Sequence, residues 1–290
     1  MDFKNANELL TLCEEKNLPI SEIMRLREIE LGETTAETVK ERMSRVLEIM
    51  KDAARSPIEK PVKSMGGLIG GEARKLSIHA QNSQGLCGDL LQRAITYAMA
   101  TLETNASMGL IVASPTAGSA GIVPGLMLAM QEHYHFSDDQ IIQALFNASA
   151  IGYLAMRNAT VAGAVGGCQA EVGVASAMAA SAAVELMGGT PKECTYAAST
   201  VLMNMLGLVC DPVGGLVEVP CVKRNVGGAV NALAAADMAL AGITSKIPVD
   251  QVIDAMKEVG DKMDVSLRET GVGGVAGTPA AQEVVEKLGM

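Results

Sequence analysis

The chain has 290 residues, a formal net charge of −10 and 49% hydrophobic residues. This length allows one large domain or two ordinary ones, with enough apolar surface to build a core. The acidic balance and the absence of a Lys/Arg cluster argue against nucleic acid as a partner. Aromatic residues make up only 2% and methionine is frequent, at 18, so we expect small and flexible side chains that let helices pack closely.

The N-terminus leads directly into a charged amphipathic stretch, without an apolar segment followed by a small-residue cleavage site. We therefore expect a cytoplasmic protein. The uncharged run 104–131 is interrupted by Pro115, Pro124 and several glycines, which favours a buried soluble segment over a membrane span. Six cysteines in a cytoplasmic chain indicate reduced thiols or metal ligands and argue against disulfides.

Residues 1–56 carry charge at helical spacing and predict an amphipathic helical N-terminal region. A capping box at Thr34-Thr35-Ala36-Glu37 precedes its last apolar stripe. Two prolines, Pro57 and Pro61, then break the pattern, and beyond them charge thins and glycine pairs recur. We place a boundary there, followed by a helical catalytic, cluster-binding core over 57–290 that belongs to one continuous domain.

Helices separated by glycine loops are predicted for the rest of the chain. Caps at Ser137-Asp138-Asp139-Gln140 and Thr190-Pro191-Lys192-Glu193 each start a helix. Segments 172–187 and 194–209 are almost uncharged and predict central helices buried on every side. An amphipathic helix over 248–259 is expected to end at Gly260. Strand signals are poor, so we predict an all-α fold: a compact multi-helix domain whose glycine-rich loops converge on a cluster site.

Four glycine-rich loops stand out, at 64–71, at 114–121, around Cys168 and around Cys210. In the second, Thr116 and Ser119 add hydroxyl groups just before an apolar helix, which favours a small carboxylate as the ligand. The alternative is that such loops have only a structural role, as tight connections in an alanine-rich core. The loop at 64–71 lacks the Lys-Ser or Lys-Thr tail of a phosphate loop, and Lys75 lies in a charged stretch, so neither a nucleotide nor pyridoxal phosphate (PLP) is expected.

Three cysteines, Cys168, Cys210 and Cys221, lie in stretches that contain glycine or proline. Such backbone can bend around a metal cluster, and three thiolates leave one metal corner open. Intervals of 41 and 10 residues between them match neither ferredoxins nor zinc knuckles, so spacing alone names no metal. Buried cysteines also serve as small hydrophobic residues, which is our interpretation of Cys13, Cys87 and Cys194.

Several motifs resemble the α subunit of the iron-sulfur-dependent L-serine dehydratases over nearly the whole chain. These motifs are Asn105 to Ser119, Gly167-Cys168-Gln169-Ala170-Glu171-Val172-Gly173, Cys210 to Cys221, Arg224-Asn225, Arg268-Glu269-Thr270 and Gly273-Gly274. The resemblance implies an all-α subunit in which Cys168, Cys210 and Cys221 ligate a four-iron four-sulfur cluster (4Fe-4S). It also implies deamination of L-serine to pyruvate and ammonia.

In the mechanism that the resemblance implies, the open iron makes the serine hydroxyl a better leaving group while a base removes the α-proton. Loss of water leaves aminoacrylate, which tautomerises and hydrolyses. We expect Thr116, Gly118 and Ser119 to hold the substrate carboxylate, and Ser64 to line the same cleft. The catalytic base stays unassigned, because His133 and His135 lie in a connector and His79 has no paired carboxylate in sequence.

Because two-chain relatives pair the α subunit with a separate β subunit, that partner is the expected source of the base, in a hetero-oligomer. Ala120 stands where several relatives have cysteine, and no cysteine follows Cys221. Some single-chain relatives place a terminal cysteine on the open iron. Here the open corner is therefore expected to hold water, an anion or a partner group, and the cluster to be oxygen-labile.

Two alternatives stay open. The first is another cluster-dependent lyase that acts on a related small amino acid, such as an L-cysteine desulfidase. The second is a catalytically silent helical subunit, in which the glycine- and alanine-rich segments pack against a partner and the thiols are only part of the core.

Overall fold

The computed structural model describes residues 1–82 and 85–289, and the regular elements of that part of the chain are all helical. The predicted all-α fold is thus confirmed. The α-helices are α1 (Ala6–Lys16), α2 (Ile20–Leu31), α3 (Ala36–Glu59), α4 (Glu72–Asn82), α5 (Gly88–Ala106), α6 (Ile122–Tyr134), α7 (Asp138–Asn158), α8 (Gly163–Gly166), α9 (Val174–Leu186), α10 (Pro191–Met205), α11 (Cys221–Leu240), α12 (Val249–Lys262) and α13 (Pro279–Lys287). Short 3-10 and π segments lie between them: η1 (Ala117–Ser119), η2 (Gln169–Gly173), η3 (Val213–Gly215), η4 (Val265–Leu267) and η5 (Gly274–Gly277).

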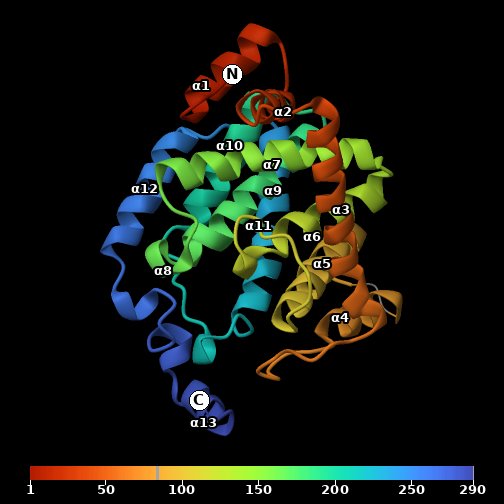
Figure 1. The fold of residues 1–290 in the computed structure, drawn as a ribbon. Helices are drawn as coiled ribbons and strands as arrows, with labels where there is room; N and C mark the ends of the chain where they lie inside the picture. Colours follow the sequence, from red (N-terminus) through yellow and green to blue (C-terminus); the bar gives the residue numbers. More distant parts are fainter. Residues whose placement is uncertain (83–84, 290) are drawn as a thin grey trace.

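Helix α9 is the centre of the fold (Figure 1). Every residue from Val174 to Val184 is buried, and α9 packs against α6, α7, α10 and α11. Most of these residues are alanine or serine, so the surrounding helices approach closely without large side chains between them. The prediction of a central helix over 172–187, buried on every side, is confirmed for the turns of α9 that end at Val184.

Helix α10 departs from the second central helix that the sequence predicts. It ends at Met205, four residues before the expected end, and Met203 and Leu206 are exposed. Its inner face, which includes Cys194, Ala198 and Leu202, is buried. A run of uncharged residues shows that a helix tolerates burial, but it does not reveal which side a neighbouring helix covers.

The first proline after the N-terminal region does not end a helix. Pro57 lies in the last turn of α3, which continues to Glu59. Proline leaves the carbonyl four residues earlier without its usual donor. Here the hydroxyl of Thr104 on α5 donates to that carbonyl of Ala53, at 2.8 Å. The predicted boundary between 1–56 and 57–290 therefore falls inside a continuous helix, and Phe3 and Leu9 belong to the same buried core as Ile122.

Helix ends test the capping predictions. Complete capping boxes join Ser137 to Gln140 and Thr190 to Glu193, as predicted. At α3 the predicted box is displaced by one residue, because Thr35 is the cap and accepts from the backbone N–H of Thr38. The predicted stop at Gly260 is wrong: α12 continues to Lys262. The missing Cβ of Gly260 serves close packing against Gly166 of α8, where a Cβ would lie 3.0 Å from the Gly166 Cα.

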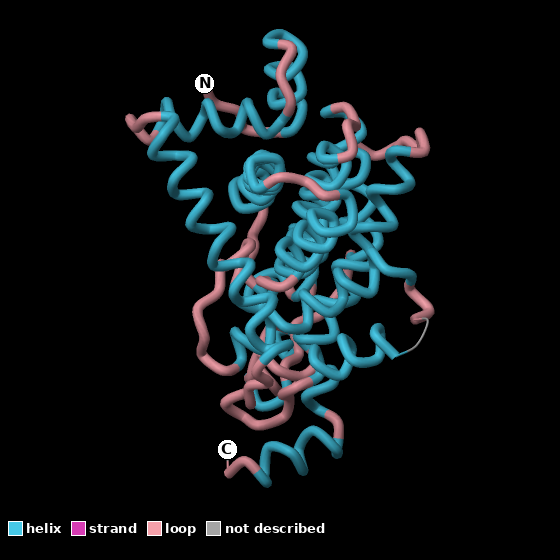
Figure 2. The backbone as a smooth tube through the Cα atoms, turned by 90° about the vertical axis from the view of Figure 1, so that its right-hand side faces the viewer, coloured by secondary structure: helices cyan, strands magenta, loops and turns pink. Residues whose placement is uncertain are grey.

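Loops gather in the half of the molecule nearer the C-terminus (Figure 2). There the segment that follows α10 pairs with the segment that follows α12, since the Cys210 N–H donates to Leu267 and the Glu269 N–H to Cys210. The described helices include none that is both long and apolar enough to cross a membrane. Loops from distant parts of the sequence are thus brought together at one end of the bundle.

A pair of acidic side chains joins α4 to α5 below the glycine-rich loop 64–71. Glu103 is 1% exposed and accepts from the Ala73 N–H at 3.0 Å, while Glu72 accepts from the Gly70 N–H. The second carboxyl oxygen of Glu103 accepts from no N–H or hydroxyl group among the described residues, and the Glu72 carboxyl group is its neighbour. Burial, together with the hydrogen bond to Glu72, raises the pKa of Glu103 to about 7. The pair therefore shares a proton at and below neutral pH.

This shared proton predicts a pH-dependent stability. The pKa of Glu103 is raised above its ordinary value of 4.5, so the folded state holds a proton that the unfolded state releases, and stability falls as pH rises from about 4.5 to about 7. Glu103→Gln, whose amide needs no added proton, should remove this loss, which is on the order of 2 kcal/mol. Thermal unfolding at pH 5 and pH 8 measures it. The exposed Glu41→Gln on α3 is the control, and parallel pH profiles for Glu103→Gln and the unaltered chain would contradict the shared proton.

Candidate functional site

Three cysteines from distant segments line one cavity of about 250 Å³. Cys168 follows Gly167, whose φ of 76° is in the left-handed region, and directly precedes the π-helix η2. Cys210 lies in the loop after α10, and Cys221 is the first residue of α11. All three thiols are buried. The cavity is also lined by Thr116, Ala117, Gly118, Glu171, Val172, Pro212, Val217 and Glu269.

A carboxylate joins two of the thiols. The Sγ atoms of Cys168 and Cys210 and a carboxylate oxygen of Glu171 all lie within 4.8 Å of one another, a grouping able to hold a metal ion. Glu171 Oε2 lies 3.8 Å from Cys210 Sγ, and Oε1 accepts from the Thr116 hydroxyl at 2.6 Å. Burial raises the pKa of Glu171. Cys221 is not part of this tight group and contributes its thiol from the adjoining wall.

The wide turn of η2 sets the direction of both Cys168 and Glu171. Gln169, 1% exposed, anchors this turn, since its amide donates to the Met256 carbonyl at 2.9 Å and accepts from the Gly207 N–H at 2.9 Å. π-Turns inside helical segments are rare and occur mainly at functional sites. Here the turn places a thiol and a carboxylate, three residues apart, on the same cavity.

Arg224 is the partly buried cation beside the thiols. Its Nη1 lies 3.8 Å from Cys168 Sγ, 2.7 Å from the Val209 carbonyl and 2.6 Å from Asp211 Oδ1. The hydrogen bond from the Cys210 thiol and the positive charge of Arg224 lower the pKa of Cys168. The same hydrogen bond and burial raise the pKa of Cys210, and burial raises the pKa of Cys221 to about 12. Without a bound metal, Cys168 is thus the thiol most readily ionised.

Two glycines make room for the Glu171 carboxylate. A Cβ on Gly163 would collide with Glu171 Oε2 and lie 3.0 Å from Cys210 Sγ, and one on Gly118 would lie 3.3 Å from Glu171 Oε1. Asn225 of α11, fully buried, holds the loop that contains Gly118. Its amide donates to the Gly118 carbonyl at 2.8 Å and accepts from the Gly121 N–H at 3.0 Å. Residues 116–121 are therefore held against the start of α11.

The predicted substrate-binding residues occupy different places. Thr116 and Gly118 line the cavity. Ser119 is fully buried behind them, with its hydroxyl 3.1 Å from that of Thr116. Ser64 is not among the lining residues, and its hydroxyl donates to the buried Glu218 at 2.5 Å. Glu218 also accepts from the backbone N–H groups of residues 66 and 68, so it ties the loop 64–71 to the segment between Cys210 and Cys221.

Sequence reasoning predicts no role for three charged residues of the site, although all three belong to the family motifs: Glu171, Arg224 and Glu269. An acidic residue three positions after a cysteine shares its face of a helical turn, and this spacing was the available signal for Glu171. Arg224 and Glu269 carry no such signal. The first acts across the fold on Cys168, and the second reaches the cavity through the backbone pairing of Cys210 with residues 267–269.

The donor set fits a thiolate-bound metal. Soft sulfur ligands select iron-sulfur clusters, zinc or copper(I), and three thiols lie on this one cavity. Its walls are largely closed by buried residues such as Val172, and a neighbouring guanidinium favours the ionised form of Cys168. The arrangement can therefore bind a metal centre and admit a small polar molecule beside it.

Comparison with known proteins bears on the whole chain. Residues 15–276 match the family described as serine dehydratase alpha chain. The chain is 51% identical to a probable L-serine dehydratase, alpha chain, of Bacillus subtilis over 99% of this chain and 95% of that protein. It is 42% identical to the L-serine dehydratase, alpha chain, of Peptoniphilus asaccharolyticus over 97% of both. A longer L-serine dehydratase of Streptomyces coelicolor is 38% identical, with 60% of its length covered. The chain thus belongs to the serine dehydratase alpha chain family.

Proposed function

We propose that this chain is the α subunit of an L-serine dehydratase, which converts L-serine to pyruvate and ammonia. The observation that carries the proposal is the convergence of Cys168, Cys210 and Cys221 on one cavity with Glu171 and Thr116, in a chain whose relatives are named L-serine dehydratases. The reaction is an elimination. It requires help for a poor leaving group, an acceptor for the α-proton and shelter for the enamine product.

Cys168, Cys210 and Cys221 would hold a 4Fe-4S cluster. When bound, such a cluster supplies a Lewis acid at its iron without a cysteine ligand, which assists departure of a hydroxyl group. Arg224 supports this role from the protein side, because its positive charge offsets part of the negative charge of the thiolate of Cys168. No PLP is required in this scheme.

The chain's own polar groups would bind and orient the substrate. Thr116 and Gly118 lie on the cavity wall, on a loop that precedes the N-terminus of α6, where positive partial charge favours a carboxylate. Ser119 supports the Thr116 hydroxyl from behind, and Ser64 supports the loop 64–71 through Glu218. We therefore assign contact with the substrate carboxylate to Thr116 and Gly118, and a supporting role to the two serines.

Glu171 is the group that we assign to holding a proton at the cavity. Its Oε1 is positioned by the Thr116 hydroxyl at 2.6 Å, and it is buried among the thiols. Glu269 lines the same cavity from an exposed position and is the second carboxylate there. A base from a partner subunit would be an addition to these two carboxylates.

A β subunit is the proposed partner. Two of the relatives are named alpha chains, and this chain covers 95% and 97% of them. It covers only 60% of the Streptomyces coelicolor protein named L-serine dehydratase without a chain designation. Such longer relatives have room for a second domain beyond the part that the present chain covers. We accordingly propose a hetero-oligomer that functions in the cytoplasm.

The metal and the substrate are tested together. The chain, purified anaerobically with and without the β partner, should contain iron and sulfide and form pyruvate from L-serine only in the complex. Each of three variants should lose iron and at least a hundredfold in activity, because an incomplete set of thiolates no longer retains the cluster: Cys168→Ser, Cys210→Ser and Cys221→Ser. Substitution of groups that only support the metal ligands already lowers metal affinity or activity by roughly 10–100-fold. The exposed Cys87→Ser is the control.

Three results would count against this assignment. Iron retained at full occupancy in all three cysteine variants would exclude them as ligands. Sulfide and pyruvate from L-cysteine, without activity on L-serine, would show a desulfidase. Failure to bind iron after anaerobic reconstitution, with no activity in the complex, would favour a silent helical subunit.

The role of Glu171 has a separate test. Glu171→Gln keeps the side chain's size and its contact with Thr116 but cannot accept a proton, so kcat should fall by roughly 10²–10⁴-fold with little change in KM. Iron and sulfide content should stay at the level of the unaltered chain. The exposed Glu258→Gln on α12 is the matched control. Loss of iron from Glu171→Gln would instead show that the carboxylate is a metal ligand, and an unchanged kcat would remove it from the reaction.

A further inference from the structure

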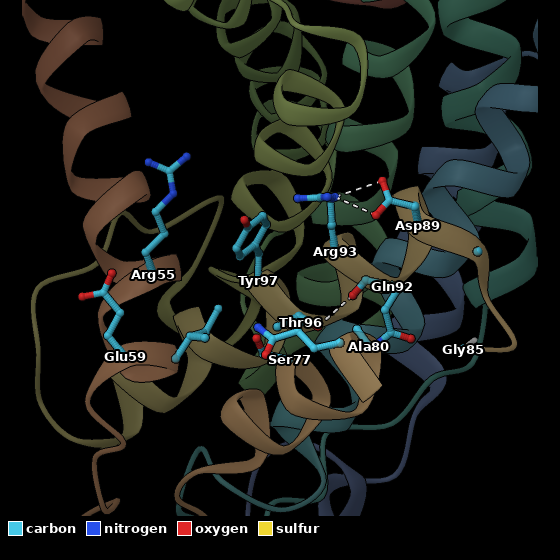
Figure 3. Close-up of a pocket in the computed structure, with 13 residues that line it drawn as sticks. Arg55, Glu59, Ser77, Ala80, Gly85, Asp89, Gln92, Arg93, Thr96 and Tyr97 are labelled. Carbon is cyan, nitrogen blue, oxygen red and sulfur yellow. Dashed lines mark hydrogen bonds and ion pairs between the residues drawn. The ribbon is translucent and has the colours of Figure 1, made fainter. Parts of the chain in front are cut away.

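A second cavity, of about 660 Å³, lies between α3, α4 and α5 (Figure 3). It shares no lining residue with the cysteine cavity. Small-molecule sites are typically clefts of roughly 300–1,000 Å³ with a few converging polar groups. The proposed dehydratase reaction uses none of the residues on its walls, so its polar groups need a separate account.

Among these polar groups, Gln92 gives the most direct indication of a ligand. It is 8% exposed and lines the cavity, yet its amide Nε2 has no acceptor among the described residues. Figure 3 shows its side chain among the lining residues, on the side of Gly85. A buried amide donor without a partner destabilises the fold, and a ligand with an acceptor oxygen would remove this cost.

Two guanidinium groups add further donors on neighbouring walls. Arg55 Nη2 and Arg93 Nη1 donate to the two oxygens of Glu132, each at 2.9 Å, and Arg93 Nε donates to both oxygens of Asp89 at 3.0 Å. Tyr97 also donates to Glu132, at 2.7 Å, so this carboxylate fixes all three side chains. Within the described part of the chain, Nη1 of Arg55 and Nη2 of Arg93 form no further hydrogen bond. Positioned donors of this kind suit a carboxylate.

The charge balance around the cavity limits the ligand. Glu59, in the last turn of α3, lines the wall that Arg55 and Ile58 also form, and Arg74 donates to the carbonyls of Ile58 and Glu59. The charged residues that line the space are two cations, Arg55 and Arg93, and two anions, Glu59 and Asp89. A ligand with net charge would upset this balance, whereas one with both charges would find a partner for each.

We propose that this cavity binds a small zwitterion of the amino-acid type, with its carboxylate toward Gln92 and Arg93 and its ammonium group toward Glu59. The apolar part of the ligand would lie against Ile58 and Ala80, which also line the space. Helix α5, which carries Gln92 and Arg93, packs directly against α11, the helix that begins with Cys221. A ligand in this cavity would thus contact a helix that supports the cysteine site.

L-leucine is a suitable probe, since it has no β-hydroxyl or thiol group to be eliminated. Calorimetric titration of the full-length chain, alone and with the β partner, should show L-leucine binding more tightly than 4-methylpentanoate, which lacks the ammonium group, or 3-methylbutylamine, which lacks the carboxylate. Gln92→Leu and Arg93→Met should each weaken L-leucine binding by about tenfold or more. Arg45→Met, on the exposed part of α3, is the matched control.

Thr116→Val separates this cavity from the one that contains the cysteines, and it should leave L-leucine binding unchanged. If Thr116→Val abolishes binding while Gln92→Leu does not, the amino acid binds beside the thiols and the inference is overturned. Equal binding of 4-methylpentanoate would contradict the requirement for a zwitterion. If none of the three compounds binds to the unaltered chain, the proposed amino-acid site is overturned. Melting temperatures guard against misfolding: Gln92→Leu removes an unpaired buried amide and should melt at the same or a higher temperature.

Discussion

One partly buried cation, Arg224, holds the cysteine site together. Its guanidinium contacts Cys168, the carbonyl of Val209 and the carboxylate of Asp211, so a side chain at the start of α11 joins both sides of the cavity. Asp211 in turn accepts from the Val275 N–H, which brings in the segment before α13. Thiolates gathered in a buried site repel one another, and a fixed positive charge reduces that repulsion. The positions of the remaining site residues depend on this arrangement.

Small residues make the convergence of loops possible. Gly163 and Gly118 admit the Glu171 carboxylate, and Gly260 admits the backbone of α8 next to the π-turn. The alanine-rich α9 behind the site lets four helices pack around one axis. Buried polar links then hold each loop: Asn225 for residues 118–121, Glu218 for the loop 64–71 and Gln169 for the π-turn. Glycine and alanine residues thus leave space for the loops to approach one another, and hydrogen bonds fix the positions of the loops.

Local signals predicted local structure well. The caps at Ser137 and Thr190 work through residues three positions away, so they are legible in the sequence and occur in the structure. Pro57 and Gly260 were misinterpreted, because their outcome depends on partners far along the chain: Thr104 satisfies the carbonyl that Pro57 leaves free, and Gly166 occupies the space beside Gly260. The same distinction applies to the site. Thr116 and Gly118 line the cavity, whereas the Ser64 hydroxyl is directed to Glu218, a residue 154 positions away.

By itself the sequence determined that the chain is helical, that its core consists of small side chains and that three cysteines lie on turn-forming backbone, because these depend on composition, period and neighbouring residues. Only the tertiary structure decided that Glu171 lies close to both Cys168 and Cys210, that Arg224 is the cation beside them, and that α3, α4 and α5 enclose a second polar cavity. Burial and charge pairing are set by residues far apart in sequence. No local pattern encodes which of them will meet.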